Sequence, residues 1–270
     1  MKDKLILITG ATDGIGRSTA ARLAEKGYKL LIHGRNSEKL KSTKEEIINK
    51  TNNSNIDTIN IDLSSLEDVG LKAKEIKEKY PEIYCLINNA GTFQKEKNLT
   101  KEGYEFTFTI NHLAPFLLTN ILLDNLKKGS PSRIINVSSI AHRNGKINFD
   151  NLNAEESFTP YGTYALSKLA NILFTNELAK RVKDFNIIAN SLHPGVIDTK
   201  LLRTGFNVSG ASIEEGSENS VYLASSNEVK DITGKYFVKL TPASIDSKWN
   251  DPKLLKDFWE KSEEMVRSYL

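Results

Sequence analysis

The stretch Thr9-Gly10-Ala11-Thr12-Asp13-Gly14-Ile15-Gly16 lies between an apolar run at residues 4–9 and a predicted helix at residues 17–26. Its glycines permit a tight turn, a close approach of backbone N–H groups to a pyrophosphate, and close packing of helix on strand. The N-terminus of the helix would then face the anion. Glycine clusters often mark only a turn, but this position between strand and helix predicts a dinucleotide-binding site.

Six more apolar runs follow, separated by segments of helix length. Runs of consecutive apolar residues are typical of parallel strands that helices cover on both faces. Because crossovers between parallel strands are right-handed, the pattern predicts an α/β fold with a doubly wound parallel sheet of about seven strands, the Rossmann arrangement. The six runs cover residues 28–33, 56–61, 83–88, 133–138, 186–191 and 236–240.

The chain is expected to form one domain over residues 1–270, since no change of composition marks a linker. Residues 200–211 are predicted to form a mobile loop that closes over a substrate. Ser212 has capping-box spacing ahead of a helix that extends through Leu223. Apolar residues at helical spacing predict a helix near residues 252–268. Core packing is its main interpretation, and a lid, a dimer contact or membrane-surface binding are the alternatives.

Composition and charge exclude several classes of protein. The 37 basic and 34 acidic residues give a net charge of +3 without a basic block, so we expect no nucleic-acid partner. The single cysteine, Cys85, cannot form an internal disulfide. The N-terminus enters the first strand without room for a secretion signal. These features predict a cytoplasmic protein, and the spacing of His, Cys and carboxylates predicts no metal site.

One uncharged stretch is long enough to suggest a membrane span. Residues 106–123 contain no Asp, Glu, Lys or Arg. Asn111, His112, Pro115 and Asn120 interrupt the stretch, and polar groups in hydrocarbon are costly. We therefore expect a helix buried in the protein and no membrane span.

The end of the second predicted strand indicates which dinucleotide would bind. An NAD site usually places a carboxylate about 20 residues past the glycine turn, where it binds the ribose 2′-hydroxyl. Here the sequence is His33-Gly34-Arg35-Asn36, and Arg35 and Arg17 could flank a 2′-phosphate. A carboxylate within about 4 Å of that phosphate would cost on the order of 4 kcal/mol. The sequence thus predicts NADP(H) over NAD(H), and the alternative is that both arginines are solvated at helix ends.

Tyr164 and Lys168 are four positions apart on a predicted helix, which places both side chains on one face. Such a pair is expected about once by chance in this composition. Other polar residues stand at strand ends, Asn88 to Gly91 after the fourth strand and Ser138-Ser139 after the fifth, and Asn111 lies in the uncharged stretch. Because the carboxyl ends of parallel strands share one edge of a sheet, these residues are expected to meet there.

From Thr9 to about Lys239 the chain resembles the short-chain dehydrogenase/reductase family. The resemblance implies an oxidoreductase that moves a hydride between NADP(H) and a carbonyl or alcohol substrate. The motifs that carry it stand in the family's order: the glycine turn, Asp62-Leu63, Asn88 to Gly91, Asn111, Ser139, Tyr164 with Lys168, and Pro194-Gly195 with Thr199.

The resemblance implies a catalytic set of Asn111, Ser139, Tyr164 and Lys168. Tyr164 is the proton donor or acceptor, and Lys168 holds the nicotinamide ribose and lowers the pKa of the tyrosine. Ser139 orients the substrate oxygen, although Ser138 competes for this role, and Asn111 completes a proton relay. A phenol with a pKa of about 10 is a poor base near neutrality, so it needs a neighbouring cation that favours the phenolate and lowers this pKa.

The resemblance also implies which residues bind the cofactor. Asp62 would approach the adenine, Asn88 the adenine ribose, and Val196 and Thr199 the nicotinamide amide. The full set is Gly10, Thr12, Asp13, Gly14, Ile15, Gly16, Arg17, Arg35, Asp62, Leu63, Asn88, Ala90, Gly91, Tyr164, Lys168, Pro194, Gly195, Val196 and Thr199.

The segment between Ser139 and Tyr164 is longer than in many family members. Its extra residues 146–152, with residues 167–171 and 193–195, are similar to the retinol dehydrogenase and WW-domain oxidoreductase branch. That branch often handles apolar carbonyls or alcohols, so a lipophilic aldehyde or ketone is the leading expectation. Apolar contacts are expected from Leu201, Leu202 and Phe206.

Other interpretations remain open at this point. Sugar-nucleotide epimerases share the tyrosine and lysine but usually have a different glycine spacing and a longer C-terminal domain. A non-catalytic NADPH sensor is the alternative from another class, although binding alone requires neither the phenol nor the serine. His112 and His193 are expected to be structural. The family resemblance further suggests a homo-oligomer formed through the helices near Asn111 and Tyr164.

Overall fold

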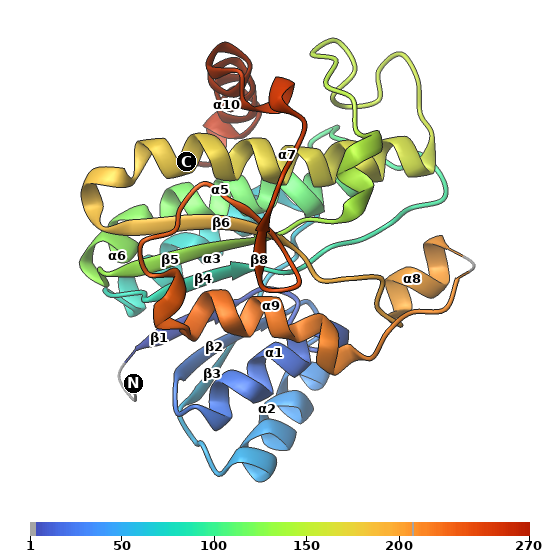
Figure 1. The fold of residues 1–270 in the computed structure, drawn as a ribbon. Coiled ribbons are helices and arrows are strands. Elements are labelled where there is room, and N and C mark those ends of the chain that lie inside the picture. Colours follow the sequence, from blue (N-terminus) through green and yellow to red (C-terminus); the bar gives the residue numbers. More distant parts are fainter. Residues whose placement is uncertain (1–3, 207) are drawn as a thin grey trace.

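Eight strands form one sheet in the order β3-β2-β1-β4-β5-β6-β7-β8 in the computed structural model, which describes residues 4–206 and 208–270 (Figure 1). Strands β1 to β7 are parallel, and β8 is antiparallel to β7. The order reverses between β1 and β4, the kind of switch point at which open α/β sheets bind ligands. The strands are β1 (Leu5–Ile8), β2 (Lys29–Gly34), β3 (Ile56–Asn60), β4 (Cys85–Asn88), β5 (Ser132–Val137), β6 (Ile187–His193), β7 (Tyr236–Val238) and β8 (Thr241–Ala243).

The predicted α/β class and doubly wound parallel sheet are confirmed, and the strand count is corrected from about seven to eight. The extra strand, β8, has three residues and contains Pro242, which a sheet tolerates at its edge. Parts of two predictions fall outside the described residues: the approach to the first strand at residues 1–3, and residue 207 of the predicted loop.

Helices cover both faces of the sheet (Figure 1). Leu5 and Leu7 of β1 point into the core beneath one set of helices, and Ile6 and Ile8 point into the core beneath the other. This alternation explains why the strands are apolar at consecutive positions. One face carries α1 (Gly14–Glu25), α2 (Ser37–Thr51) and α9 (Ile213–Ser225); the other carries α3 (Leu66–Lys79), α5 (Ala114–Ile121), α6 (Leu123–Lys128) and α7 (Pro160–Arg181).

The uncharged stretch forms a buried, nearly continuous helix, as predicted. It begins with α4 (Phe106–Phe108), passes through a π-helical turn at Thr109–Leu113 and continues into α5. Asn111 and His112 in the π-helical turn are completely buried. Within residues 4–206 and 208–270, no helix has the length and apolar character needed to cross a bilayer.

The C-terminal helix α10 (Pro252–Val266) packs across α7 and α5, and the core packing predicted for it is confirmed (Figure 1). Phe258 and Trp259 on its inner face are buried, and the Trp259 ring packs against those of Phe116 and Phe174. The helix therefore covers part of the surface through which a homo-oligomer was expected. The oligomeric state itself stays a prediction.

Residues 200–211 differ from the predicted loop, because they begin with a short helix, α8 (Lys200–Gly205). The hydroxyl oxygen of Thr199 accepts a hydrogen bond from the backbone N–H of Leu202 at 3.3 Å and caps this helix. After the helix, Ile197 and Ala211 pair in an isolated bridge. The segment is thus anchored at both ends beside β6.

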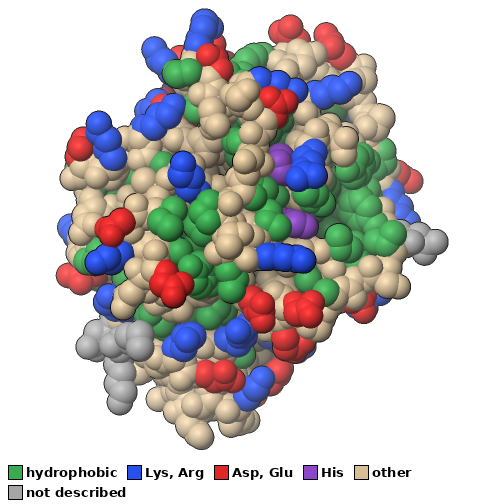
Figure 2. Space-filling model, in the orientation of Figure 1, with side chains coloured by type: hydrophobic (Ala, Val, Ile, Leu, Met, Phe, Trp, Pro, Cys, Tyr) green, Lys and Arg blue, Asp and Glu red, His purple; other side chains and the backbone are tan. Residues whose placement is uncertain are grey.

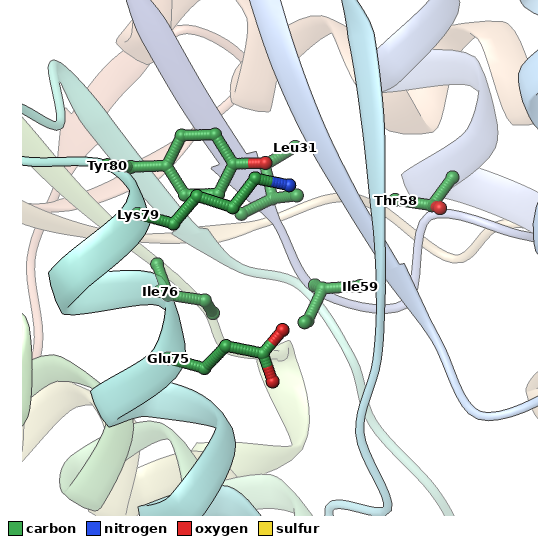
Figure 3. A pocket seen from close by; sticks show the side chains of 7 residues that line it. All are labelled: Leu31, Thr58, Ile59, Glu75, Ile76, Lys79 and Tyr80. Atoms are coloured by element: carbon green, nitrogen blue, oxygen red, sulfur yellow. The ribbon is translucent and has the colours of Figure 1, made fainter.

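A small cavity lies between α3 and strands β2 and β3 (Figure 3). The hydroxyl of Tyr80 at its rim donates a hydrogen bond to the Asp57 carboxylate at 2.8 Å. With a volume of about 20 Å³, the cavity has room for little more than one water molecule. It is a packing defect near the sheet edge. Its lining residues are Leu31, Thr58, Ile59, Glu75, Ile76, Lys79 and Tyr80.

Candidate active site

The glycine turn joins β1 to α1 and leaves no room for side chains at two of its positions. Gly10 has a φ of +65°, and a Cβ there would lie 2.9 Å from the Cα of Ala90. A Cβ on Gly16 would collide with the carbonyl oxygen of Gly10 and with the side-chain amide of Asn89. The backbone of β1, the turn and the loop after β4 therefore approach as closely as glycine allows.

Two polar side chains that the sequence did not single out brace this turn. The amide of Asn89 donates hydrogen bonds to the carbonyl oxygens of Thr9 at 2.9 Å and Gly10 at 3.2 Å. The backbone N–H of Gly10 donates to Nδ1 of His33 at 3.1 Å. Burial lowers the pKa of His33, so the ring is neutral and its Nε2–H donates to the carbonyl of Ile61 at 3.0 Å. A histidine inside an apolar strand was the signal that could have revealed this brace.

A surface pocket of about 720 Å³ adjoins the turn at the ends of β1 and β2. Arg35 lines it, as the NADP(H) prediction requires, whereas the Arg17 guanidinium forms an ion pair with Glu46 at 3.3 Å. Lys39, which was not predicted, also lines the pocket, and its ammonium lies 2.9 Å from the Asp13 carboxylate. This hydrogen bond lowers the pKa of Asp13. The lining residues are Thr12, Asp13, Arg35, Asn36, Glu38, Lys39 and Ser42.

The predicted contact of Asn88 with the adenine ribose is not supported by its side chain. The Asn88 amide is buried and donates to Asn136 at 2.8 Å and to Thr119 at 3.1 Å. It ties β4 to β5 and α5 instead of facing the cleft. Asp62, by contrast, is exposed after β3, where its carboxylate accepts from the backbone and hydroxyl of Ser64. Leu63 is buried beside it.

The segment after β6 reaches the glycine turn from the other side. Pro194 and Gly195 lead out of the strand, with Gly195 at a φ of +104°. Val196 is 46% exposed, and the methyl group of Thr199 would lie 3.4 Å from a Cβ on Gly14. The start of α1 and this segment thus lie side by side at Gly14 and Thr199.

Two side chains from separate segments converge beside Gly91. A Cβ on this glycine would lie 3.3 Å from Nζ of Lys168 and 3.4 Å from Oδ1 of Asn111. The Asn111 side chain bonds to the backbone N–H and carbonyl of Thr92 at 2.7 and 3.0 Å and to Ser167 at 2.9 Å. Asn111 thereby fixes the loop after β4 and does not itself bond to Lys168.

Tyr164 is buried on α7, and Lys168 lies one turn further along, with Nζ 5.6 Å from the centre of the phenol ring. Burial raises the pKa of Tyr164 to about 12, and the neighbouring Ser139 hydroxyl acts in the opposite direction. Burial lowers the pKa of Lys168 to about 8. Within this chain alone, burial therefore outweighs the lowering of the tyrosine pKa that the resemblance implied.

The geometry separates the two candidate serines. The Ser138 hydroxyl is buried and donates to the carbonyl of Lys168 at 2.6 Å, so it is occupied within the core. Ser139 caps the short helical turn Ile140–Asn144, and its hydroxyl lies beside the phenol of Tyr164, where it acts to lower the pKa of that phenol. His193 supports this turn, because its Nδ1 accepts from the N–H of Ile140 at 3.3 Å. Burial lowers the pKa of His193 to about 4, so the ring is neutral and structural.

An apolar wall covers the tyrosine. The ring centroid of Tyr164 lies 5.6 Å from that of Phe93 and 5.9 Å from that of Phe206, and Leu201 packs against the same cluster. Leu201, Leu202 and Phe206 were predicted to supply apolar contacts to a substrate; Leu201 and Phe206 pack in this cluster, and Leu202 does not belong to it. Phe93 was missed because nothing in its sequence neighbourhood marks it. In Figure 2, hydrophobic side chains gather on the right, where the surface is hollowed beside α8.

The residues present fit a nicotinamide dinucleotide. The glycine turn is a cradle that a Cβ would fill, and α1 begins there. The pocket lined by Arg35 and Lys39 adjoins the turn, and the Lys168 ammonium lies beside Gly91. Residues of the turn would hold the pyrophosphate, and Lys168 the nicotinamide ribose. In the part of the chain that the structure describes, no three His, Cys, Asp or Glu side chains are grouped to hold a metal ion.

Known proteins are similar to this chain over most of its length. A family model described as short chain dehydrogenase matches residues 4–207. The chain is 38% identical over 292 residues to human retinol dehydrogenase 14, covering 98% of this chain and 87% of that protein. A solved structure of an uncharacterised protein from Mycobacterium paratuberculosis has a TM-score of 0.82 at 28% identity, covering 98% of this chain and 93% of that one. A structure from Escherichia coli CFT073, described as a short chain dehydrogenase complexed with NADPH, has a TM-score of 0.73 at 25% identity, covering 88% and 96%.

Proposed function

Because the chain belongs to the short-chain dehydrogenase family, we propose that it is an NADP(H)-dependent oxidoreductase acting on the carbonyl or alcohol group of an apolar substrate. The observation that carries the proposal is the meeting of Tyr164, Ser139 and Lys168 near Gly91, beneath the wall of Phe93 and Phe206. Polar catalytic groups covered by aromatic rings are suited to bind a substrate whose carbonyl group is attached to an apolar chain or ring.

The side chains have separate tasks in this proposal. NADPH, when bound, supplies the hydride. Tyr164 gives its proton to the carbonyl oxygen during reduction and takes it back during oxidation. Its pKa of about 12 keeps the proton on the phenol near neutrality, which suits donation. Ser139 orients the substrate oxygen, and Lys168, with a pKa of about 8, is largely an ammonium at pH 7 that binds the ribose.

A direct test is the oxidation of NADPH, followed by absorbance, on mixing with aldehydes, quinones and diketones of graded chain length. We expect turnover that increases with the apolar character of the carbonyl. NADPH binding without turnover across the whole panel would favour the sensor over the enzyme.

The preference for NADP(H) rests on Arg35 in the pocket beside the turn, whose other charged lining residues are Lys39, Asp13 and Glu38. Arg35 is free to face a 2′-phosphate, because the described residues offer it no ion-pair partner. Arg35→Ala should raise the Kd for NADPH about tenfold and leave the Kd for NADH unchanged, since only the phosphate loses a charged partner. Fluorescence titration measures both constants.

Arg17→Ala is the matched control for this prediction, because the Arg17 guanidinium is already held by Glu46. We expect a smaller change in NADPH affinity from it. Tighter binding of NADH than of NADPH by the unmodified protein would contradict the cofactor preference.

The apolar substrate class rests on the aromatic wall. The Phe206 ring lies 5.3 Å from Phe93 and 6.0 Å from Tyr161, so Phe206→Ala opens the roof over the phenol. We expect the KM for nonanal to rise about tenfold, as expected from the loss of about 1.5 kcal/mol of apolar contact, while the KM for propanal stays the same. Phe185→Ala, at an exposed phenylalanine on the turn after α7, is the control. Equal changes for both aldehydes would argue against an apolar substrate.

A cytoplasmic location and a homo-oligomeric state remain predictions from the sequence. Any oligomer formed through α5 and α7 would have to leave room for α10, which packs on both helices.

A further inference from the structure

The peptide group between Ser139 and Ile140 is held at both ends by buried histidine rings. Its carbonyl oxygen, on Ser139, accepts a hydrogen bond from Nδ1 of His142 at 2.7 Å. Its N–H, on Ile140, donates a hydrogen bond to Nδ1 of His193 at 3.3 Å. The two rings come from different segments, because His142 lies in the turn after β5 and His193 is the last residue of β6. The proposed mechanism uses neither ring.

These two hydrogen bonds require opposite tautomers. A carbonyl oxygen can only accept, so Nδ1 of His142 carries a proton. A backbone N–H can only donate, so Nδ1 of His193 carries none, and the proton of that ring is on Nε2. Burial lowers the pKa of both rings, that of His193 to about 4, and both are therefore neutral at pH 7.5.

Both histidines are fixed by their surroundings. His142 is 3% exposed, and its ring makes a T-shaped contact with that of Tyr236 in β7, with the centroids 4.7 Å apart. The carbonyl oxygen of His193 accepts a hydrogen bond from the side-chain amide of Asn219 in α9 at 2.9 Å. The amide oxygen of Asn219 accepts in turn from the backbone N–H of Leu240 at 2.8 Å. The peptide after Ser139 is thus held by groups that are themselves held in place.

Ser139 is anchored on both sides. Before it, the backbone N–H and the hydroxyl of Ser138 donate to the carbonyl oxygens of Leu192 at 2.8 Å and Lys168 at 2.6 Å. After it, the peptide group is planar, so hydrogen bonds at both its carbonyl and its N–H fix the rotation of that plane. The Ser139 hydroxyl oxygen accepts from the N–H of Ala141 at 3.2 Å, which leaves the hydroxyl hydrogen to be donated elsewhere.

We infer that His142 and His193 are positioning residues, which hold the peptide group after Ser139 between them and thereby aim the Ser139 hydroxyl at the reacting oxygen of the substrate. The inference rests on the proposed function, because the role of Ser139 belongs to that function. Neither ring exchanges a proton in the reaction. The competing interpretation is packing alone, in which the rings only fill space between the turn and strands β6 and β7.

The tautomers can be tested without any turnover. The chain has four histidines, so ¹⁵N NMR of labelled protein gives four sets of ring signals, and His142→Asn and His193→Asn each remove one set. At pH 7.5 we expect a proton on Nδ1 of His142 and none on Nδ1 of His193. A proton on Nε2 alone in His142, or a proton on Nδ1 of His193, would overturn the proposal. This readout does not depend on finding a carbonyl substrate.

A pair of substitutions at each ring separates hydrogen bonding from packing. Asparagine and leucine have the same branched shape, but only the asparagine amide places a donor or an acceptor where Nδ1 lies. Packing alone would make leucine the milder change at these buried positions, because it is apolar. Positioning predicts the opposite: kcat with NADPH and nonanal should stay within about threefold for His142→Asn and His193→Asn and fall about tenfold for His142→Leu and His193→Leu. Leucine variants as active as their asparagine counterparts would overturn the proposal.

The action through the serine can be tested in a Ser139→Ala background by single-turnover NADPH oxidation. If the rings act by placing the hydroxyl, its removal should leave His193→Leu with a further effect of no more than about twofold. A further tenfold loss in the double variant would contradict the proposal. The Kd for NADPH should stay within about twofold in every variant, as expected of folded proteins. Absence of turnover with every carbonyl would count against the proposed function, and the tautomers would still decide whether the peptide is held as inferred.

Tyr236→Phe is the matched control, because Tyr236 contacts His142 without taking part in the hydrogen bonds that hold the peptide. Its buried hydroxyl has no hydrogen-bond partner among the described residues, so the substitution keeps the ring that packs on His142 and removes no hydrogen bond. We expect kcat within about twofold and unchanged tautomers. A tenfold loss would show that kcat responds to any change around these rings, which is the result that packing alone predicts.

Discussion

Tyr164→Phe is expected to lower kcat about a thousandfold while the Kd for NADPH stays within about twofold, because it removes the only proton-donating atom of this ring. The phenylalanine ring keeps the contacts with Phe93 and Phe206, so the cleft is not disturbed. The two quantities are measured by steady-state NADPH oxidation and by fluorescence titration. Full activity in this variant would remove the basis of the proposed mechanism.

Tyr161→Phe is the matched control for this experiment. Tyr161 lies on the same helix and near Phe206, but it is 40% exposed and its hydroxyl accepts a hydrogen bond from Asn144 at 2.9 Å. The same hydroxyl deletion three residues away should leave kcat within about twofold. A comparable loss in both variants would indicate a general disturbance of α7 instead of the loss of a proton donor.

Gly16→Ala is expected to weaken NADPH binding at least a hundredfold and to destabilise the fold by about 2 kcal/mol. Its methyl group would enter the space of the Gly10 carbonyl and the Asn89 amide, so the turn must widen and the Asn89 brace must break. NADPH titration measures the first effect and urea unfolding the second. The two readouts separate a folded protein that no longer binds from one that no longer folds.

Gly27→Ala provides the comparison, since a Cβ there meets nothing within 4 Å although φ is +82°. We expect a stability loss of about 1 kcal/mol from the positive φ and an unchanged Kd for NADPH. Binding by Gly16→Ala as tight as in the unmodified protein would contradict the assignment of the glycine turn as the pyrophosphate cradle.

The sequence predicted seven of the eight strands, most of which are buried on both faces, and missed the short edge strand β8. Strands such as β1 and β5 are apolar at consecutive positions because each side chain meets a helix layer, and this pattern is visible without a structure. Strand β8 has only three residues, two exposed and one partly exposed, and one of them is a proline, so its pairing with β7 depends on a tertiary contact that no local pattern records. The helix at Lys200–Gly205 depends on its cap at Thr199. This helix was missed from the sequence because the glycines in the segment favoured a loop.

At the candidate site the sequence indicated which residues gather, and the structure was needed to see where their side chains point. Asn88 and Asn136 are register partners on β4 and β5, and that pairing directs the Asn88 amide into the core. The choice between Ser138 and Ser139 likewise depends on which hydroxyl donates a hydrogen bond to the α7 backbone, and only the structure shows that Ser138 donates to the carbonyl oxygen of Lys168. The bond between His112 and Ser262 joins residues 150 positions apart, a separation over which sequence patterns carry no signal.

The proline in β8 affects how molecules of this protein meet one another at high concentration. An open sheet margin with free backbone donors recruits further strands and is a common start of fibrillar aggregates. Here the margin is three residues long, and Pro242 at its centre has no amide hydrogen to offer an incoming chain. The missing amide hydrogen of Pro242 therefore disfavours the addition of a strand from another molecule at the β8 edge, whether or not a cofactor is bound.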